Sequence, residues 1–90
     1  MNKRLHALFS GRVQGVGFRY TAERLAHHFP VTGFVKNLPD GKVEVIAEGE
    51  EDMLKDFLKA IEDAFSGHIR KIDPQWQKAT GEYRTFGIGF

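Results

Sequence analysis

Hydrophobic and polar residues alternate in parts of this chain and recur at helical spacing in others, which predicts a mixture of strands and helices. Residues 5–12 alternate, and both of their faces carry apolar side chains, as in a strand inside a sheet. Apolar residues recur at helical spacing from Phe18 to Phe29, and Pro30 ends this predicted helix. Residues 50–65 predict a second amphipathic helix, followed by Gly67. Further strands are predicted at residues 31–38, 42–48, 68–77 and 83–90.

The predicted order is strand, helix, strand, strand, helix, strand, with a short additional strand at the end. Two strand–helix–strand units with right-handed crossovers place both helices on one face of a single sheet. Pro39, Asp40 and Gly41 are typical of a hairpin turn, whereas Pro74 interrupts the strand predicted at residues 68–77. Ninety residues are enough for one hydrophobic core. We therefore expect a single α+β domain over residues 1–90, with both helices on one face of a mostly antiparallel sheet.

Composition limits the classes of function. The net charge is +1, so bulk charge does not call for a polyanionic partner. No cysteine is present, which excludes disulfides and thiolate chemistry, and the four histidines do not have metal-binding spacing. The longest apolar runs are far shorter than the roughly 20 residues that cross a membrane. We expect a cytoplasmic protein that uses no metal, no cofactor and no membrane.

The most distinctive stretch is residues 11–19, between the first predicted strand and the first helix. Its three glycines allow backbone N–H groups to converge on one point, toward which the helix also directs its positive end. Arg19 falls in the first helical turn, where a cation is unfavourable unless an anion binds beside it. Its guanidinium can bind a phosphate through two parallel hydrogen bonds. The stretch is therefore a candidate phosphate or carboxylate site.

The spacing alone is equally compatible with a simple glycine-rich turn, a solvated Arg19 and a structural Gln14. Two common nucleotide motifs are excluded. No Lys-Ser or Lys-Thr pair follows the last glycine, as a P-loop would require. Tyr20 stands where the dinucleotide-binding fingerprint has its third glycine.

The missing residue types near this stretch limit its chemistry. Without a nearby Asp, Glu, Cys or Lys, such a site can hydrolyse only a reactive ester or anhydride. An acyl phosphate qualifies, because its carboxylate leaving group has a pKa of about 4 and departs without protonation. The reaction then needs stabilisation of the phosphoryl charge and a positioned water. Asn37, at the end of the second predicted strand, can hold that water, although an Asn there can equally start the hairpin turn.

These residues resemble the acylphosphatase family closely. Residues 11–19 match the loop signature of the family, and residues 33–37, continuing through residues 40–44, match its second signature. The resemblance covers essentially the whole chain in length and element order. Leu38 is a departure, because many members carry Ser or Thr directly after the catalytic Asn.

The resemblance implies a ferredoxin-like α/β sandwich and a metal-free hydrolase that converts small acyl phosphates to a carboxylate and inorganic phosphate. It implies that Arg19 binds the phosphate and Asn37 orients the attacking water. Inorganic phosphate is expected to be both product and inhibitor, and the protein is expected to be a monomer. The implied phosphate-binding loop consists of Gln14, Gly15, Val16, Gly17, Phe18 and Arg19.

Two other functions were weighed against hydrolysis. The same element order also builds an RNA-recognition domain, which stacks bases on aromatic residues of its third strand. Residues 42–48 contain no aromatic residue and two acids, so we expect no nucleic-acid partner. A regulatory domain that binds a phosphorylated ligand without turnover is compatible with the glycine loop. The pairing of Asn37 with Arg19 favours turnover, because binding alone needs no group that positions water.

Overall fold

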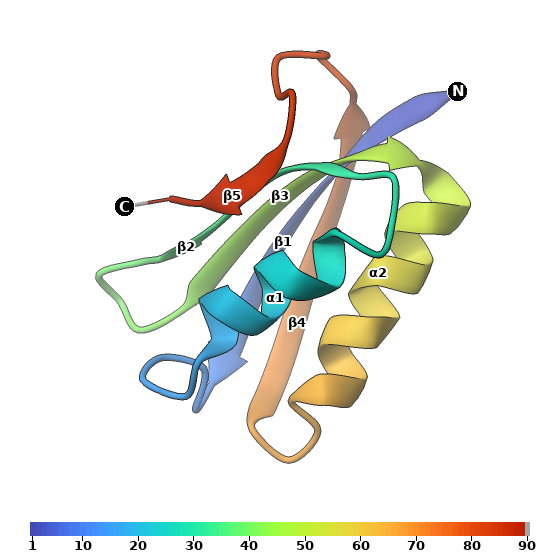
Figure 1. Ribbon diagram of the computed structural model, residues 1–90. Coiled ribbons are helices and arrows are strands. Elements are labelled where there is room, and N and C mark those ends of the chain that lie inside the picture. Colours follow the sequence, from blue (N-terminus) through green and yellow to red (C-terminus); the bar gives the residue numbers. More distant parts are fainter. Residues whose placement is uncertain (90) are drawn as a thin grey trace.

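Five strands form one sheet, and two helices cover one of its faces (Figure 1). The computed structural model describes residues 1–89. The strand order is β4-β1-β3-β2-β5, and every neighbouring pair is antiparallel except β2 and β5. This confirms the predicted element order and the ferredoxin-like α+β fold. The elements are β1 (Asn2–Gly11), α1 (Phe18–Ala26), β2 (Thr32–Asn37), β3 (Val43–Glu50), α2 (Glu51–Ala64), β4 (Ile69–Lys78) and β5 (Phe86–Ile88).

The core lies between the sheet and the two helices. Alternate residues of β1 and β3 point toward the helices and are fully buried, as the period of two requires. Phe18, the first residue of α1, lies between Phe9 and Phe65, with ring centroids 5.0 and 4.5 Å away. Because this ring is buried, the start of α1 is fixed at the edge of the core. Buried residues of this layer include Leu5, Ala7, Phe9, Val43, Val45, Ala47, Leu54, Phe57 and Ile61.

Pro74 does not interrupt β4, contrary to the expectation from sequence. The strand runs from Ile69 to Lys78, and Pro74 pairs with Ala7 of β1. Because β4 is an edge strand, it hydrogen-bonds on one side only, where a residue without an N–H group can be accommodated.

Helix α1 is shorter than predicted. It ends at Ala26 rather than Phe29, and the following N–H groups bond to carbonyls three residues back, from His27 to Arg24 and from His28 to Leu25. Such bonds tighten the chain as it leaves a helix, and Pro30 disfavours helical backbone at the residue before it. Phe29 still packs on Phe57, at a ring distance of 5.9 Å, which explains why the apolar spacing extends beyond the helix.

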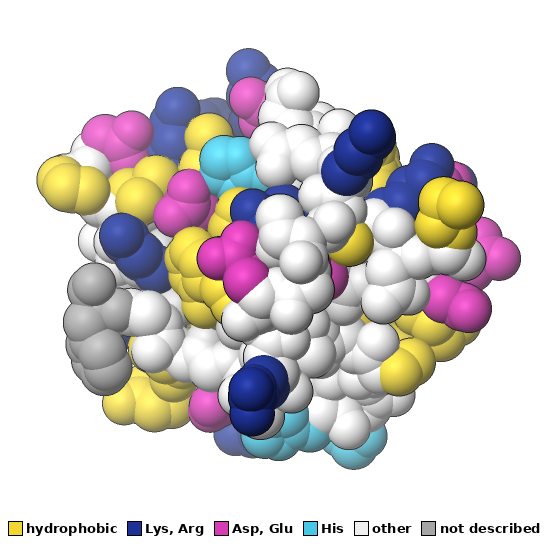
Figure 2. Space-filling model, turned by 90° about the horizontal axis from the view of Figure 1, so that it is seen from above, with side chains coloured by type: hydrophobic (Ala, Val, Ile, Leu, Met, Phe, Trp, Pro, Cys, Tyr) yellow, Lys and Arg dark blue, Asp and Glu magenta, His cyan; other side chains and the backbone are white. Residues whose placement is uncertain are grey.

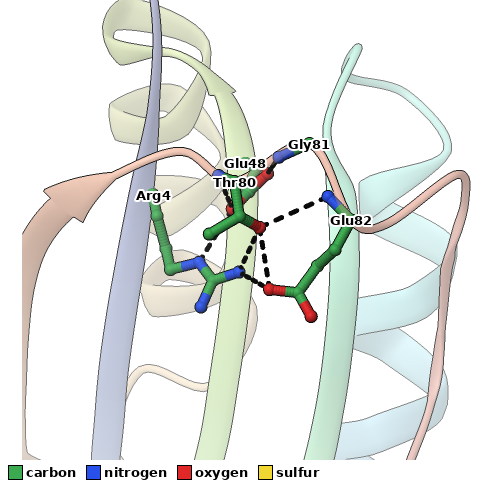
Figure 3. A network of polar contacts seen from close by, with 5 residues as sticks. All are labelled: Arg4, Glu48, Thr80, Gly81 and Glu82. Atoms are coloured by element: carbon green, nitrogen blue, oxygen red, sulfur yellow. Dashed lines mark hydrogen bonds and ion pairs between the residues drawn. The ribbon is translucent and has the colours of Figure 1, made fainter.

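The last strand is also shorter than predicted. Residues 83–90 were expected to form it, whereas β5 covers only Phe86–Ile88, and Phe90 lies outside the described residues. Residues 79–85 form a loop instead, which follows β4 and bonds to Glu48 of β3 (Figure 3). Glu48 and Arg4 alternate with the core residues of their strands, so this loop lies against the sheet face away from the helices.

The Glu48 carboxylate is only 4% exposed and is fully hydrogen-bonded. It accepts from the N–H groups of Thr80 and Gly81, both at 2.9 Å, and from Arg4 Nε at 2.8 Å (Figure 3). Burial by itself raises the pKa of Glu48, but these hydrogen bonds outweigh it and lower the pKa to about 2. The buried charge therefore fastens the 79–85 loop to the sheet. Neither helix within residues 1–89 is long and apolar enough to cross a membrane.

Candidate active site

Arg19 and Asn37 line one small pocket of about 190 Å³, although they come from different elements. Arg19 is the second residue of α1, and Asn37 is the last residue of β2. Asn37 lies two positions after the fully buried Val35 in β2, so both side chains are on the sheet face that the helices cover. The other lining residues are Val13, Gly15, Gly17, Phe18 and Tyr20.

The loop before α1 has the backbone geometry of an anion site. Gly15 and Gly17 have φ values of +77° and +78°, in the left-handed region that other residues rarely occupy. Gly17 is the N-cap of α1, and no side chain caps this helix end. Across residues 1–89, no backbone carbonyl accepts a hydrogen bond from the N–H groups of residues 14–17. These donors and the first turn of α1 are therefore free to face a bound anion.

Two buried side chains hold the ends of this loop in place. Val13 is fully buried before it, and Phe18 is packed into the core after it, so only the backbone of Phe18 can serve an anion. Val16 is partly buried and also packs against the core. Gly15, Gly17 and Phe18 thus line the pocket, whereas Val16 does not.

Gln14 bonds to the β2–β3 hairpin rather than facing the pocket. Its side-chain Nε2 donates to the carbonyl of Leu38 at 2.8 Å and to the carbonyl of Lys42 at 2.9 Å. The sequence expectation that the Gln14 side chain is structural is therefore compatible with its contacts. Its backbone N–H group remains among the candidate donors.

Tyr20 and Val13 are pocket residues that the sequence reasoning did not single out. Tyr20 is 65% exposed and stands beside Arg19 in the first turn of α1, a position that could have drawn attention to it. Val13 carries no chemical signal, because a buried valine is expected in any core. Among residues 1–89, Arg19 takes part in none of the ion pairs, so no carboxylate neutralises its guanidinium.

One face of the molecule carries charges of both signs. On the face seen in Figure 2, Lys and Arg side chains are interspersed with Asp and Glu. This face therefore differs from the basic platform typical of nucleic-acid binding, and the net charge of the whole chain is only +1. Within residues 1–89, no three His, Cys, Asp or Glu side chains are grouped so that they could hold a metal ion.

A ferredoxin-like sheet, the glycine-rich loop of residues 12–17 (the anion loop), and an Arg and an Asn in one pocket define a small α/β domain with a candidate oxyanion site. The family model of acylphosphatases matches residues 5–88. The acylphosphatase of Methanospirillum hungatei is 42% identical over 88 residues, which cover 96% of each chain. The crystal structure of the Bacillus subtilis acylphosphatase superposes with a TM-score of 0.90 at 34% identity, covering 98% of this chain and 99% of that one. The chain therefore belongs to the acylphosphatase family, and the predicted resemblance is confirmed.

The same fold also occurs inside a larger protein. In the crystal structure of T. kodakarensis HypF, a matching region has a TM-score of 0.83 and 31% identity. It covers 97% of this chain but only 12% of HypF. The same fold thus occurs both as a chain of about this length and as a small part of a much longer chain.

Proposed function

We propose that this acylphosphatase hydrolyses the carboxyl–phosphate bond of small acyl phosphates, with Arg19 and the loop N–H groups binding the phosphoryl group and Asn37 holding the attacking water. The observation that supports this most directly is the shared pocket. Arg19, Asn37 and the glycines before α1 all line it, and no side chain caps this helix end.

The phosphoryl group fits the chemistry of the loop. Its negative charge spreads over three oxygens as the bond to the acyl group breaks. The N–H groups around Gly15 and Gly17, the positive end of α1 and the Arg19 fork can each stabilise that charge. Because these donors are fixed by the buried Val13 and Phe18, they need no reorganisation when the charge develops.

Asn37 supplies orientation rather than acid or base strength. Its side-chain amide can hydrogen-bond a water and hold it opposite the scissile bond. The water oxygen then forms a bond to phosphorus while the bond from phosphorus to the acyl oxygen breaks. The electron pair leaves with the carboxylate, whose pKa of about 4 makes protonation unnecessary. The protons of the water remain on the product phosphate or pass to solvent.

The reaction proposed here is independent of metal ions and cofactors. Arg19 and the loop N–H groups provide the positive potential that a metal would otherwise provide, and a carboxylate leaving group needs no Lewis acid. Turnover should therefore be unchanged in excess EDTA. A loss of activity in EDTA that added metal restores would contradict this part of the proposal.

Variants of the two pocket residues separate binding from turnover. Arg19→Ala should abolish hydrolysis and also competitive inhibition by inorganic phosphate. Asn37→Ala should lower kcat by roughly 10²-fold or more while phosphate still inhibits. Arg24→Ala is the matched control, because Arg24 is an exposed arginine in the last turn of the same helix. Normal hydrolysis by folded Arg19→Ala would place the site elsewhere.

A folded parent that binds phosphate but turns over no acyl phosphate would favour the regulatory anion-binding function instead. Arg19→Lys adds a finer comparison. A lysine ammonium cannot form two parallel hydrogen bonds to a phosphate as the planar guanidinium does, so this variant should also lose most activity. We also propose that residues 1–90 act as a single cytoplasmic domain. We further propose that the protein is a monomer, which sedimentation at several protein concentrations would test.

A further inference from the structure

The Gln14 side chain connects two segments that each carry part of the candidate active site. It starts in the anion loop and ends on the turn between β2 and β3, directly after Asn37. Figure 1 shows the loop before α1 and the β2–β3 turn at the same end of the sheet. The two hydrogen bonds, 2.8 Å to the Leu38 carbonyl and 2.9 Å to the Lys42 carbonyl, both use Nε2. Because both partners are acceptors, the amide can satisfy them only by presenting its nitrogen.

The hairpin turn closes without Gln14. The Leu38 N–H donates to the Lys42 carbonyl at 2.8 Å, and the Gly41 N–H donates to the Leu38 carbonyl at 3.2 Å. The Lys42 N–H is bonded to Asp40 Oδ1 at 3.0 Å. Each of the two carbonyls therefore accepts one bond from the turn itself and a second one from Gln14. The side chain adds nothing to closing the turn, and what it fixes is where the closed turn lies relative to the loop.

The other end of this connection is equally well fixed. Gln14 directly follows the fully buried Val13 and directly precedes Gly15, whose backbone lies at the pocket. Asn37 directly precedes Leu38, one of the two residues that Gln14 contacts. A short path of covalent bonds and two hydrogen bonds thus runs from the loop N–H groups to the backbone of Asn37.

We propose that Gln14 is a positioning residue that holds Asn37 at the correct place relative to the anion loop. The proposal rests on the proposed function, in which Asn37 orients a water toward a phosphoryl group bound in that loop. In-line attack depends steeply on this separation, and a displacement of about 1 Å can cost roughly 10²-fold in rate. Gln14 acts through Asn37 and touches neither substrate nor water.

The substitution Gln14→Met tests this most cleanly, because it keeps the length of the side chain and removes both donors. It should lower kcat about tenfold or more while the inhibition constant of inorganic phosphate stays within about twofold. Gln77→Met, on the exposed edge strand β4, is the matched control and should leave both values unchanged. Thermal unfolding of every variant shows which ones are folded at the assay temperature.

A double-mutant cycle separates positioning from a merely structural role. If Gln14 acts through Asn37, Gln14→Met should lower kcat by less than about twofold when Asn37→Ala is already present. Equal losses in both backgrounds, or an unchanged kcat in folded Gln14→Met, would overturn the proposal.

Failure of the proposed function gives a different result, in which Asn37→Ala alone leaves kcat unchanged. Should Gln14→Met fail to fold, the same cycle can be run with Gln14→Asn. That variant keeps the amide but is about 1.5 Å too short to reach both carbonyls.

Discussion

Replacing Glu48 by glutamine tests how much a single buried carboxylate contributes to this fold. Glu48 accepts hydrogen bonds from Arg4 and from two N–H groups of the 79–85 loop, at Thr80 and Gly81. A glutamine has one acceptor oxygen and turns an NH₂ group toward at least one of these donors. The charge is lost, and one buried donor faces another, so we expect Glu48→Gln to be strongly destabilised at neutral pH.

The magnitude follows from the pKa of Glu48. Burial alone raises it, the hydrogen bonds more than compensate, and the pKa falls from 4.5 to about 2. A fall of this size corresponds to about 3 kcal/mol of unfolding free energy at pH 7. Because the pKa is lower in the folded state, this stabilisation is complete above the unfolded pKa and disappears as the pH falls through the folded pKa. By the same relation about 1.5 kcal/mol remains at pH 3.

Urea unfolding of the parent and of Glu48→Gln at pH 7 and pH 3 measures this directly. We expect Glu48→Gln to lose about 3 kcal/mol of unfolding free energy at pH 7 and about half of that at pH 3. In thermal unfolding, the loss at pH 7 corresponds to a fall of roughly 12–24 °C in Tm. Glu51→Gln is the control. The pKa of Glu51 is lowered to about 2 by Lys3 and Lys55, but this carboxylate lies on the surface, where salt screens the attraction.

The Glu51→Gln loss should therefore be small and should vanish in about 1 M salt, whereas the Glu48→Gln loss should persist. A loss under about 1 kcal/mol for Glu48→Gln at pH 7 would refute the reasoning. An equal loss at both pH values would refute it as well, because the stabilisation could then not depend on ionisation of Glu48.

Two glycine substitutions give contrasting predictions. At Gly33 an added Cβ would lie 1.8 Å from the Ile46 carbonyl oxygen, so Gly33→Ala should cost at least about 3 kcal/mol in urea unfolding. At Gly15 the space is open and only the φ of +77° would be strained, so Gly15→Ala should cost about 1–2 kcal/mol of unfolding free energy. The same substitution should lower acyl phosphate turnover tenfold or more, because relaxation of the loop turns N–H groups away from the pocket. Gly81→Ala, with φ +73° and open space in the 79–85 loop, should show the strain cost without the loss of turnover. A mild effect at Gly33, or full activity of Gly15→Ala, would count against the respective argument.

Much of the fold could be predicted because its elements follow regular periods. Alternation in β1 and the apolar stripe of α2 are properties of neighbouring residues, so the sequence alone reveals them. The end of α1 could not be read in this way. Phe29 continues the helical spacing because it packs on Phe57, even though the backbone has already left the helix.

The remaining errors depend on contacts between distant parts of the chain. The strand predicted at residues 83–90 is too long because Tyr83 packs on Phe34 and beneath Arg4, rather than continuing β5. Pro74 is tolerated because β4 is an edge strand, and strand order cannot be read from local pattern. Glu48 alternates as an exposed strand residue does, and only the 79–85 loop makes it buried.

For the candidate site, chemistry was more informative than periodicity. The glycine spacing and Arg19 could be identified because these residue types are unusual at those positions. Asn37 is an ordinary residue at the start of a turn, and its assignment depended on the resemblance to the family. The convergence of Arg19 and Asn37 on one pocket is a result of the structure, as is the contact of Gln14 with the hairpin. An amide that bonds to two backbone carbonyls leaves no trace in the sequence, because the partners are not side chains.

Hydrolysis of an acyl phosphate in ¹⁸O-labelled water tests most directly that water held by Asn37 attacks phosphorus in the anion loop. The parent, Arg19→Ala and Asn37→Ala are compared in excess EDTA, and the label is followed in both products. We predict rapid turnover by the parent alone, with ¹⁸O in the phosphate. Label in the carboxylate would show attack at the acyl carbon, and turnover that survives both substitutions would place the reaction outside this pocket.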